Sequence, residues 1–214
     1  RYSVDVIRVG IGNIESRTVR SFRGRGEIPS EIVWDGLEDK GSLAEDGQYF
    51  AELEVLYLKG NNPIVRTSSF TVDTIYPSVQ LIADYLLFSP DGDSRKDTVL
   101  VSQSSSNEVL WEGEILNNQK AVVRSFYWKG KLSKFEWDGK DENGNQLSDG
   151  VYSYQVAATD LSGNKTSALL QDIKMDTRKP LLFITLDTDG FSPNNDNYRD
   201  SQTIGLVSNL NSGI

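Results

Sequence analysis

The sequence predicts an all-β protein built from tandem β-sandwich repeats about 103 residues apart. The first observation is a duplicated stretch, since 34–49 and 137–152 have the same length and the same Trp-Asp-Gly start. The second is a series of short apolar runs at regular spacing, separated by Gly, Asn and Asp turn signals, which is typical of sandwiches. The third is that no stretch shows a convincing helical period of 3.6 residues.

The repeat is defined by landmarks at one constant offset. Trp34 and Trp137 are 103 residues apart, and the Val-Arg-Ser-Phe run at 19–22 returns at 123–126 with one residue of difference. A shared offset over many positions is the signature of an internal repeat. The same offset of 103 relates Asp73 to Asp176, Pro77 to Pro180, and Phe-Ser-Pro at 88–90 to Phe-Ser-Pro at 191–193.

These landmarks divide the chain into three parts. Residues 78–180 form one complete repeat, and residues 1–77 form a repeat that lacks its N-terminal part. Residues 181–214 are then the N-terminal part of a third repeat. Because almost no residues separate one part from the next, we expect a semi-rigid row of domains and a longer tandem array around this chain.

The strands of a repeat follow from its turn residues. A strand at 79–87 opens the complete repeat, and its copy lies at 181–186. Next comes a hairpin around Asn117-Asn118, matched in the first copy by Gly12-Asn13, because Gly and Asn tolerate the positive φ of tight turns. After the duplicated loop, alternation predicts a strand at 151–159, with Tyr152, Tyr154, Val156 and Ala158 on one face. The remaining predicted strands are 4–11, 17–22, 50–58, 109–116, 119–126, 168–175 and a short strand at 134–137, whose copy leads into Trp34.

Composition excludes several classes of function. The net charge of −9 and the pI near 4.6 argue against a nucleic-acid partner, because phosphate binding needs a basic face. The chain has no His and no Cys, so Ser-His-Asp and Cys-His catalysis are impossible within it, and zinc lacks its usual ligands. No apolar run is long enough to span a membrane.

Residues 122–160, VVRSFYWKGKLSKFEWDGKDENGNQLSDGVYSYQVAATD, resemble the immunoglobulin-like domain of bacterial flagellar hook-capping proteins, the FlgD-like family. The resemblance rests on the Val-Arg-Ser strand, Trp-Asp-Gly-x-Asp-x-x-Gly and the later Asp-Gly-x-Tyr. It implies immunoglobulin-like sandwiches and a non-catalytic structural or interaction module of a larger bacterial repeat protein. Such a module acts as a spacer, an assembly component or an adhesin, in the periplasm, at the outer membrane surface or outside the cell.

We interpret the duplicated loop as part of the scaffold. Its Trp is expected to close one end of the core, and its Tyr is expected to form a tyrosine corner with backbone. Asp138 and Asp149 are expected to cap backbone N–H groups within the loop. The motif residues are Trp34, Asp35, Gly36, Asp46, Gly47 and Tyr49 in the first copy, and Trp137, Asp138, Gly139, Asp149, Gly150 and Tyr152 in the second.

The turn after each Phe-Ser-Pro is a candidate calcium site. Both turns share Phe-Ser-Pro-x-x-Asp, a pattern similar to that of gliding-motility-associated bacterial surface modules. Carboxylates at alternating positions suit Ca²⁺, which prefers oxygen ligands. The alternative is a set of Asx turns in which the carboxylates bond local N–H groups. The candidate ligands are Asp91, Asp93 and Asp97, and Asn194, Asp196 and Asp200.

Two further tryptophans leave a second function open. Trp111 and Trp128 lie outside the duplicated loop and form a candidate ligand patch for a surface glycan or a protein. The alternative is that they pack as a cross-strand pair. The expected partners are other protein subunits or neighbouring repeats, and the alternative functions are accessory domains of a secreted enzyme and a carbohydrate-binding module.

Overall fold

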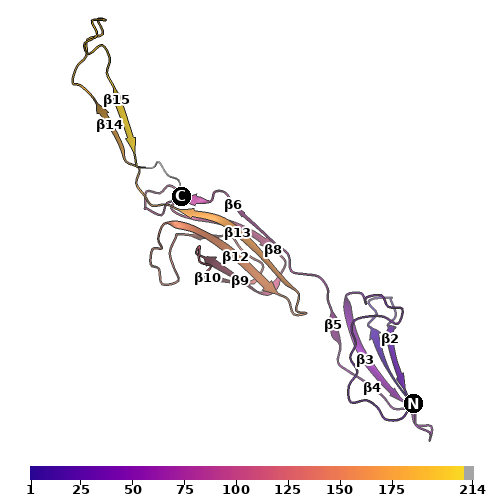
Figure 1. Cartoon of the computed structure of the whole chain (residues 1–214). Helices are drawn as coiled ribbons and strands as arrows, with labels where there is room; N and C mark the ends of the chain where they lie inside the picture. The colour runs from indigo at the N-terminus through magenta and orange to yellow at the C-terminus, as the bar shows by residue number, and fades with distance from the viewer. Residues whose placement is uncertain (210–214) are drawn as a thin grey trace. The chain divides into compact units, whose positions relative to one another are not determined.

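The computed structural model describes residues 1–209, which form strands and loops and contain no helix (Figure 1). The prediction of an all-β fold is therefore confirmed. The chain has two compact units. Residues 1–77 form the first together with the turn 159–165, and the second comprises 78–158 and the residues from Thr166 onward. None of the described segments is a helix of the length and apolarity needed to cross a membrane.

The second unit contains a two-sheet sandwich. One sheet has the order β10-β9-β12-β13-β7, and the other has the order β11-β8-β6. The strands are β6 Val79–Ala83, β7 Leu87–Phe88, β8 Val99–Ser105, β9 Glu108–Leu116, β10 Val122–Gly130, β11 Phe135–Trp137, β12 Gly150–Thr159 and β13 Lys165–Met175.

The strand predicted at 79–87 is two strands. β6 pairs antiparallel with β8, whereas β7 pairs parallel with β13 in the other sheet. The opening segment therefore crosses from one sheet to the other between Ala83 and Leu87. This crossing could not be seen in the sequence, because the partners of both strands are more than ten residues away.

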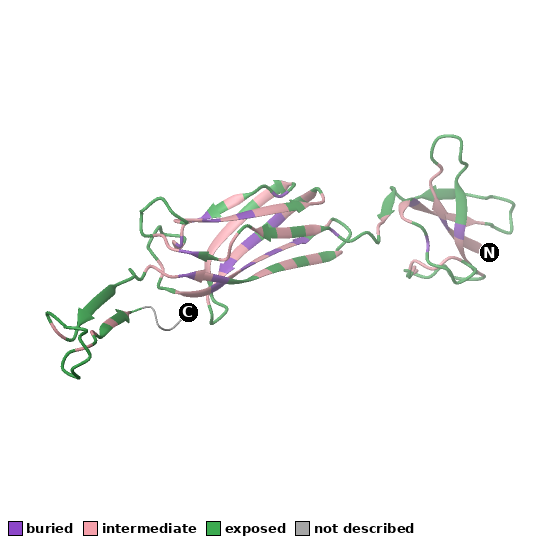
Figure 2. Cartoon of the chain, turned by 90° about the horizontal axis from the view of Figure 1, so that it is seen from above, coloured by how far each residue is buried: buried purple, intermediate pink, exposed green. Residues whose placement is uncertain are grey.

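The core lies between the two sheets and follows the predicted alternation. On β12, Tyr152, Tyr154, Val156 and Ala158 are buried, while the residues between them are half-buried. Buried bands alternate with less buried ones along the strands in Figure 2. These four side chains meet Val99 from β8 in the facing sheet. The side chains with at most 1% exposure in this cluster are Phe88, Val99, Val101, Trp111, Ile115, Trp137, Tyr154, Val156, Ile173 and Met175.

The first unit has a single sheet and a smaller core. Its strands have the order β2-β1-β3-β4, and β5 also pairs with β3. Its core cluster consists of Val6, Val19, Ala44 and Tyr49, with Trp34 packed against them. The two strands predicted at 4–11 and 50–58 are observed, but both lie closer to the N-terminus than these predicted ranges. The strands are β1 Tyr2–Arg8, β2 Arg17–Gly24, β3 Gly47–Val55, β4 Ile64–Arg66 and β5 Phe70–Val72.

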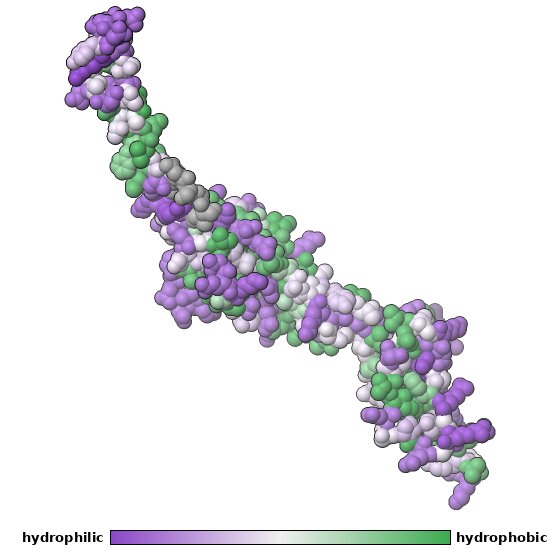
Figure 3. All heavy atoms as spheres, in the orientation of Figure 1, coloured by the Kyte–Doolittle hydropathy of each residue, from purple (hydrophilic) through white to green (hydrophobic). Residues whose placement is uncertain are grey.

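A separate hairpin, β14 Leu182–Leu186 and β15 Ile204–Ser208, lies in the part assigned to a third repeat. Its register pairs Leu182 with Ser208, just as Val79 pairs with Ser105 in the complete repeat, 103 residues earlier. Apolar side chains such as Leu182 and Leu206 are exposed on it and colour it green in Figure 3. Residues 210–214 of the expected third repeat lie outside the described residues.

Candidate functional site

The duplicated loop places its tryptophan in the core. Trp137 has no exposed surface, and its ring lies 5.0 Å from that of Tyr152 and 5.4 Å from that of Phe88, between centroids. Its indole Nε1 donates a hydrogen bond of 3.0 Å to the carbonyl of Lys140. In the first copy, Trp34 Nε1 donates a 2.8 Å bond to the carbonyl three residues later in the same way. The indole therefore fixes the start of the loop to the core in both copies.

The tyrosine of Asp-Gly-x-Tyr fixes the return of the loop. The hydroxyl of Tyr152 donates to the carbonyl of Ser148 at 2.6 Å, and that of Tyr49 donates to the carbonyl of Glu45 at 2.5 Å. Both bonds reach back four residues, the geometry of a tyrosine corner. Burial is the main cause that raises the pKa of Tyr152, and the nearby charge of Asp149 adds to it. The hydroxyl therefore stays protonated and remains a donor at neutral pH.

The aspartate of Asp-Gly-x-Tyr has a partner outside its own loop. Asp149 Oδ1 accepts bonds from the backbone N–H of Thr177 at 3.0 Å and from the Thr177 hydroxyl at 2.9 Å. Asp46 accepts the same pair of bonds from Thr74. The prediction that Asp149 caps N–H groups within its loop is therefore wrong. Both carboxylates hold the segment that leaves the repeat, and the 103-residue spacing of Thr74 and Thr177 was the available signal.

The Trp-Asp-Gly turn is stabilised locally. Asp138 Oδ1 accepts bonds from the backbone N–H of Lys140 at 3.3 Å and from Arg124 at 3.0 Å. Desolvation works to raise the pKa of Asp138, but hydrogen bonds from Lys140 and the charges of Lys140 and Arg124 outweigh it and lower that pKa. In the first copy, Asp35 caps the N–H of Leu37 at 3.0 Å.

The glycine of this turn is required by its backbone. Gly139 has a φ of +74° and Gly36 has a φ of +79°, a region that side chains with a Cβ disfavour. A Cβ at Gly139 would also lie 2.5 Å from the Sδ of Met175. The two later glycines, Gly47 and Gly150, are the first residues of β3 and β12.

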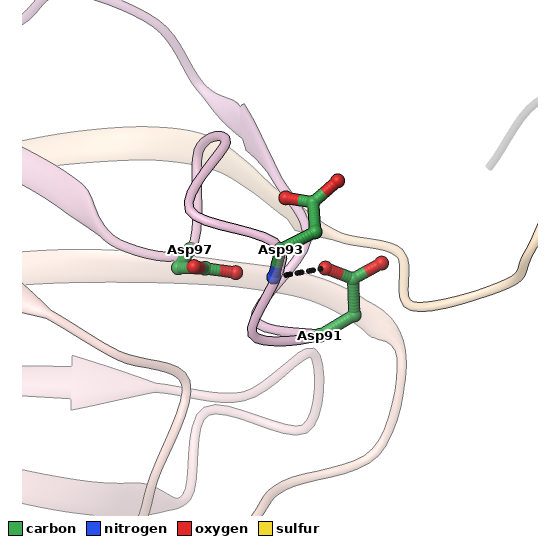
Figure 4. Close-up of side chains that lie close together, drawn as sticks. All are labelled: Asp91, Asp93 and Asp97. Carbon is green, nitrogen blue, oxygen red and sulfur yellow. Dashed lines mark hydrogen bonds between the residues drawn. The ribbon is translucent and has the colours of Figure 1, made fainter.

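The Asp-rich turn between β7 and β8 brings three carboxylates together (Figure 4). One oxygen from each of Asp91, Asp93 and Asp97 lies within 4.8 Å of the others. Asp97 also accepts bonds from the backbone N–H groups of Gly92 at 2.9 Å and Ser94 at 2.8 Å. The turn therefore forms the Asx-type bonds of the alternative interpretation, and both oxygens of Asp97 take part in them. Asp91 and Asp93 are exposed and Asp97 is half-buried, with oxygens close enough together to contact one cation.

The second Asp-rich turn repeats the backbone hydrogen bonds of the first turn but not its number of carboxylates. Asp200 accepts bonds from the N–H groups of Asn195 at 2.9 Å and Asn197 at 2.7 Å, as Asp97 does 103 residues earlier. Asn194 stands in the place of Asp91, and its amide donates to Asp196 at 3.1 Å. This turn consequently offers one carboxylate fewer than the first.

The prediction of a ligand patch is wrong for Trp111. Trp111 is fully buried, and its Nε1 donates to the carbonyl of Ser106 at 3.4 Å. Trp128 pairs directly with Trp111 across β9 and β10, is half-buried, and stacks on Phe126 at 5.8 Å. The alternative of a cross-strand packing pair therefore describes both tryptophans. In the first unit the corresponding pair is Tyr2 and Gly24, according to the strand register.

Comparison with known proteins gives a family likeness for part of the chain. Residues 114–162 match the FlgD Ig-like domain family. The chain is also 28% identical over 115 residues to a C5a peptidase of Streptococcus pyogenes serotype M3, and 29% identical over 115 residues to that of serotype M1. These alignments cover 45% of this chain but only 10% of each peptidase.

A solved structure of the tetra-tandem repeat in the extending region of a large adhesion protein is also similar, with 20% identity. The alignment covers 87% of this chain and 45% of that one, at a TM-score of 0.40, which is too low to support an argument. The comparisons therefore establish a likeness to the FlgD Ig-like domain over residues 114–162.

Proposed function

We propose that this chain is a non-catalytic structural and interaction module of a larger bacterial protein, located in the periplasm, at the outer membrane surface or outside the cell. It serves there as a spacer, an assembly component or an adhesin. One observation supports this most strongly. In both copies of the loop, Trp, Tyr and Asp are used for contacts that hold the repeat together, and the chain has no His or Cys for nucleophilic catalysis.

A second candidate function is an accessory segment of a secreted enzyme. It is favoured by the similarity to C5a peptidases, in which the matched region is one tenth of the protein's length. A peptidase domain elsewhere in the same gene product would favour this role. Further copies of the Trp-Asp-Gly loop in place of such a domain would favour the spacer role.

The proposed partners are other protein subunits or neighbouring repeats. A surface glycan remains an alternative partner, with Trp128 as its half-buried aromatic contact, because Trp111 is inaccessible. We also propose that Asp91, Asp93 and Asp97 can hold Ca²⁺, since their oxygens converge at the surface and hard oxygens suit that ion. A bound ion would stiffen the turn between β7 and β8.

A replacement experiment in the parent bacterium tests the proposed function. The segment encoding these residues is exchanged for an unrelated pair of β-sandwich domains of similar length, and a plain deletion serves as the control. We expect the exchange to preserve the activity of the parent protein and the antibody accessibility of its distal end, whereas the deletion reduces them. Loss of activity in the exchange, with normal export and abundance, would contradict a spacer role.

A further inference from the structure

We propose that the first unit binds an acidic sugar of the uronic acid class in a cavity lined by Arg1, Arg23 and Arg25. The inference rests on the glycan alternative of the proposed function, and it gives that partner a chemical class and a place on the molecule. The cavity has a volume of about 370 Å³, within the range of small-ligand pockets. Other residues that line it include Tyr2, Ser3, Glu54 and Leu56.

The three arginines of the cavity differ from the other arginines of the first unit because they have no ionic partner. Among the residues that the structure describes, no carboxylate pairs with Arg1, Arg23 or Arg25. A guanidinium group is always charged and binds a carboxylate through two parallel hydrogen bonds, so these groups remain available for an anion. The other four arginines of the unit pair as Arg8–Glu45, Arg17–Glu38, Arg20–Asp39 and Arg66–Glu52.

The hollow results from a small side chain between two long ones. Ser3 on β1 pairs with Arg23 on β2 and with Glu54 on β3, so these three residues form one row across the sheet. Side chains alternate between the two faces of a strand, and the buried Val6 of the core lies on the opposite face from Ser3. The row therefore lies on the face that points away from the core, where a ligand can reach it.

The lining suits a sugar acid better than a phosphate or a polyanion. Glu54 belongs to the cavity wall and accepts a hydrogen bond of 2.5 Å from the amide of Asn62. Its negative charge opposes an anion that carries several charges close together. The same carboxylate and the hydroxyl of Ser3 can accept hydrogen bonds from sugar hydroxyls. A uronic acid supplies both groups, since it has one carboxylate for the arginines and several hydroxyls.

A second cavity adjoins the first and offers apolar contact. It has a volume of about 640 Å³, and Arg1 and Arg25 line both cavities. Tyr57 and Leu58 in its wall are exposed, by 56% and 108%. A tyrosine ring combines a large apolar area with a polar hydroxyl, which suits the mixed surface of a sugar ring. The next sugar along a glycan is therefore expected to pack against Tyr57.

The two copies of the repeat separate this cavity from the scaffold. By strand register, the counterparts of the Arg23, Ser3 and Glu54 row in the complete repeat are Tyr127, Glu112 and Ala157. None of the three residue types recurs, although the contacts of the Trp-Asp-Gly and Asp-Gly-x-Tyr motifs do. The fold therefore does not require this row, and the cavity is a property of the first unit.

NMR titration of the full chain with matched sugars tests the site. Glucuronic acid has a carboxylate where glucose has a hydroxymethyl group, and the two are otherwise alike. We expect millimolar glucuronic acid to shift the amide resonances of Ser3, Arg23 and Gly24, and glucose to leave them in place. Added salt should weaken the binding, because it screens exposed charges. A tetrasaccharide of alternating glucuronic acid and N-acetylglucosamine should bind more tightly, and Tyr57→Ala should remove only that gain.

A double variant tests the arginines. Arg23→Gln with Arg25→Gln removes two charges from exposed positions, and circular dichroism checks that the variant folds. We expect the Kd for glucuronic acid to rise about tenfold or more, because hydrogen bonds between charged groups are the strong ones. The control is Arg95→Gln, which removes an exposed arginine of the second unit and should leave the Kd unchanged.

Four results would overturn the proposal. They are equal shifts with glucose, no shift with either acidic ligand, an unchanged Kd in the double variant, and binding of N-acetylglutamate as tight as that of glucuronic acid. The last result would make the partner an acidic peptide. Each would leave the spacer function standing, because domain replacement in the parent bacterium tests that function separately.

Discussion

Replacing Trp137 with Ala tests the structural interpretation of the duplicated loop most directly. The indole is fully buried, and removal of a buried Trp side chain costs about 3–5 kcal/mol of unfolding free energy. The lost bond to the carbonyl of Lys140 contributes about 1 kcal/mol of that range. At roughly 5 °C per kcal/mol for a domain of this size, a loss near 4 kcal/mol lowers the melting temperature by about 20 °C.

Urea unfolding followed by far-UV circular dichroism measures this loss without relying on tryptophan fluorescence. Trp137→Phe is the matched control, since it retains most of the packing and removes the Nε1 donor. Trp34→Ala should weaken the first unit less, by about 2 kcal/mol, because that side chain is only half-buried. A Trp137→Ala variant within 1 kcal/mol of the natural chain would refute the structural interpretation, most clearly if it also lost a binding partner.

Three further predictions follow from the same contacts. Tyr152→Phe removes the bond to the Ser148 carbonyl and should cost about 1 kcal/mol in the same unfolding assay, and an unchanged midpoint would contradict this role. The pKa of Asp141 is lowered, first by the hydrogen bond from the Asn145 side chain and then by the one from the Asn145 backbone N–H. Ionised Asp141 therefore stabilises the fold fully above about pH 4, and this contribution is lost as the pH falls through the lowered pKa. Asn145→Ala should therefore raise that pKa in an NMR titration, and an unmoved pKa would rule the bond out as its cause. Binding of millimolar Ca²⁺ should give a heat signal in calorimetry and raise the melting temperature of the chain, but not that of its Asp93→Asn variant. The absence of both the heat signal and the shift in melting temperature would refute the calcium proposal.

The fold was predictable because the relevant signals are local or periodic. Alternation on 151–159 identified the buried face of β12, and the Trp-Asp-Gly start marked the loop before it. Strand ends were less well placed, as at β1, which ends at Arg8 instead of residue 11. The end of a strand depends on where its partner stops, and that partner is distant in the sequence.

The candidate sites also differ in whether they depend on local or on distant contacts. The sequence located the carboxylates of Asp91, Asp93 and Asp97 on one turn because neighbouring residues in a tight turn are necessarily close. It could not establish that Trp111 is buried, because exposure on a strand depends on which face the second sheet covers.

The sequence by itself determined the repeat, the all-β class and the residues of the duplicated loop, because these depend on spacing and local turn chemistry. Only the tertiary structure decided that the opening segment divides into β6 and β7, that β7 runs parallel to β13, and that Asp149 holds Thr177. The physical reason is that each of these contacts joins segments far apart in the chain. Their partners are selected by the packing of the two sheets, and no local pattern encodes that choice.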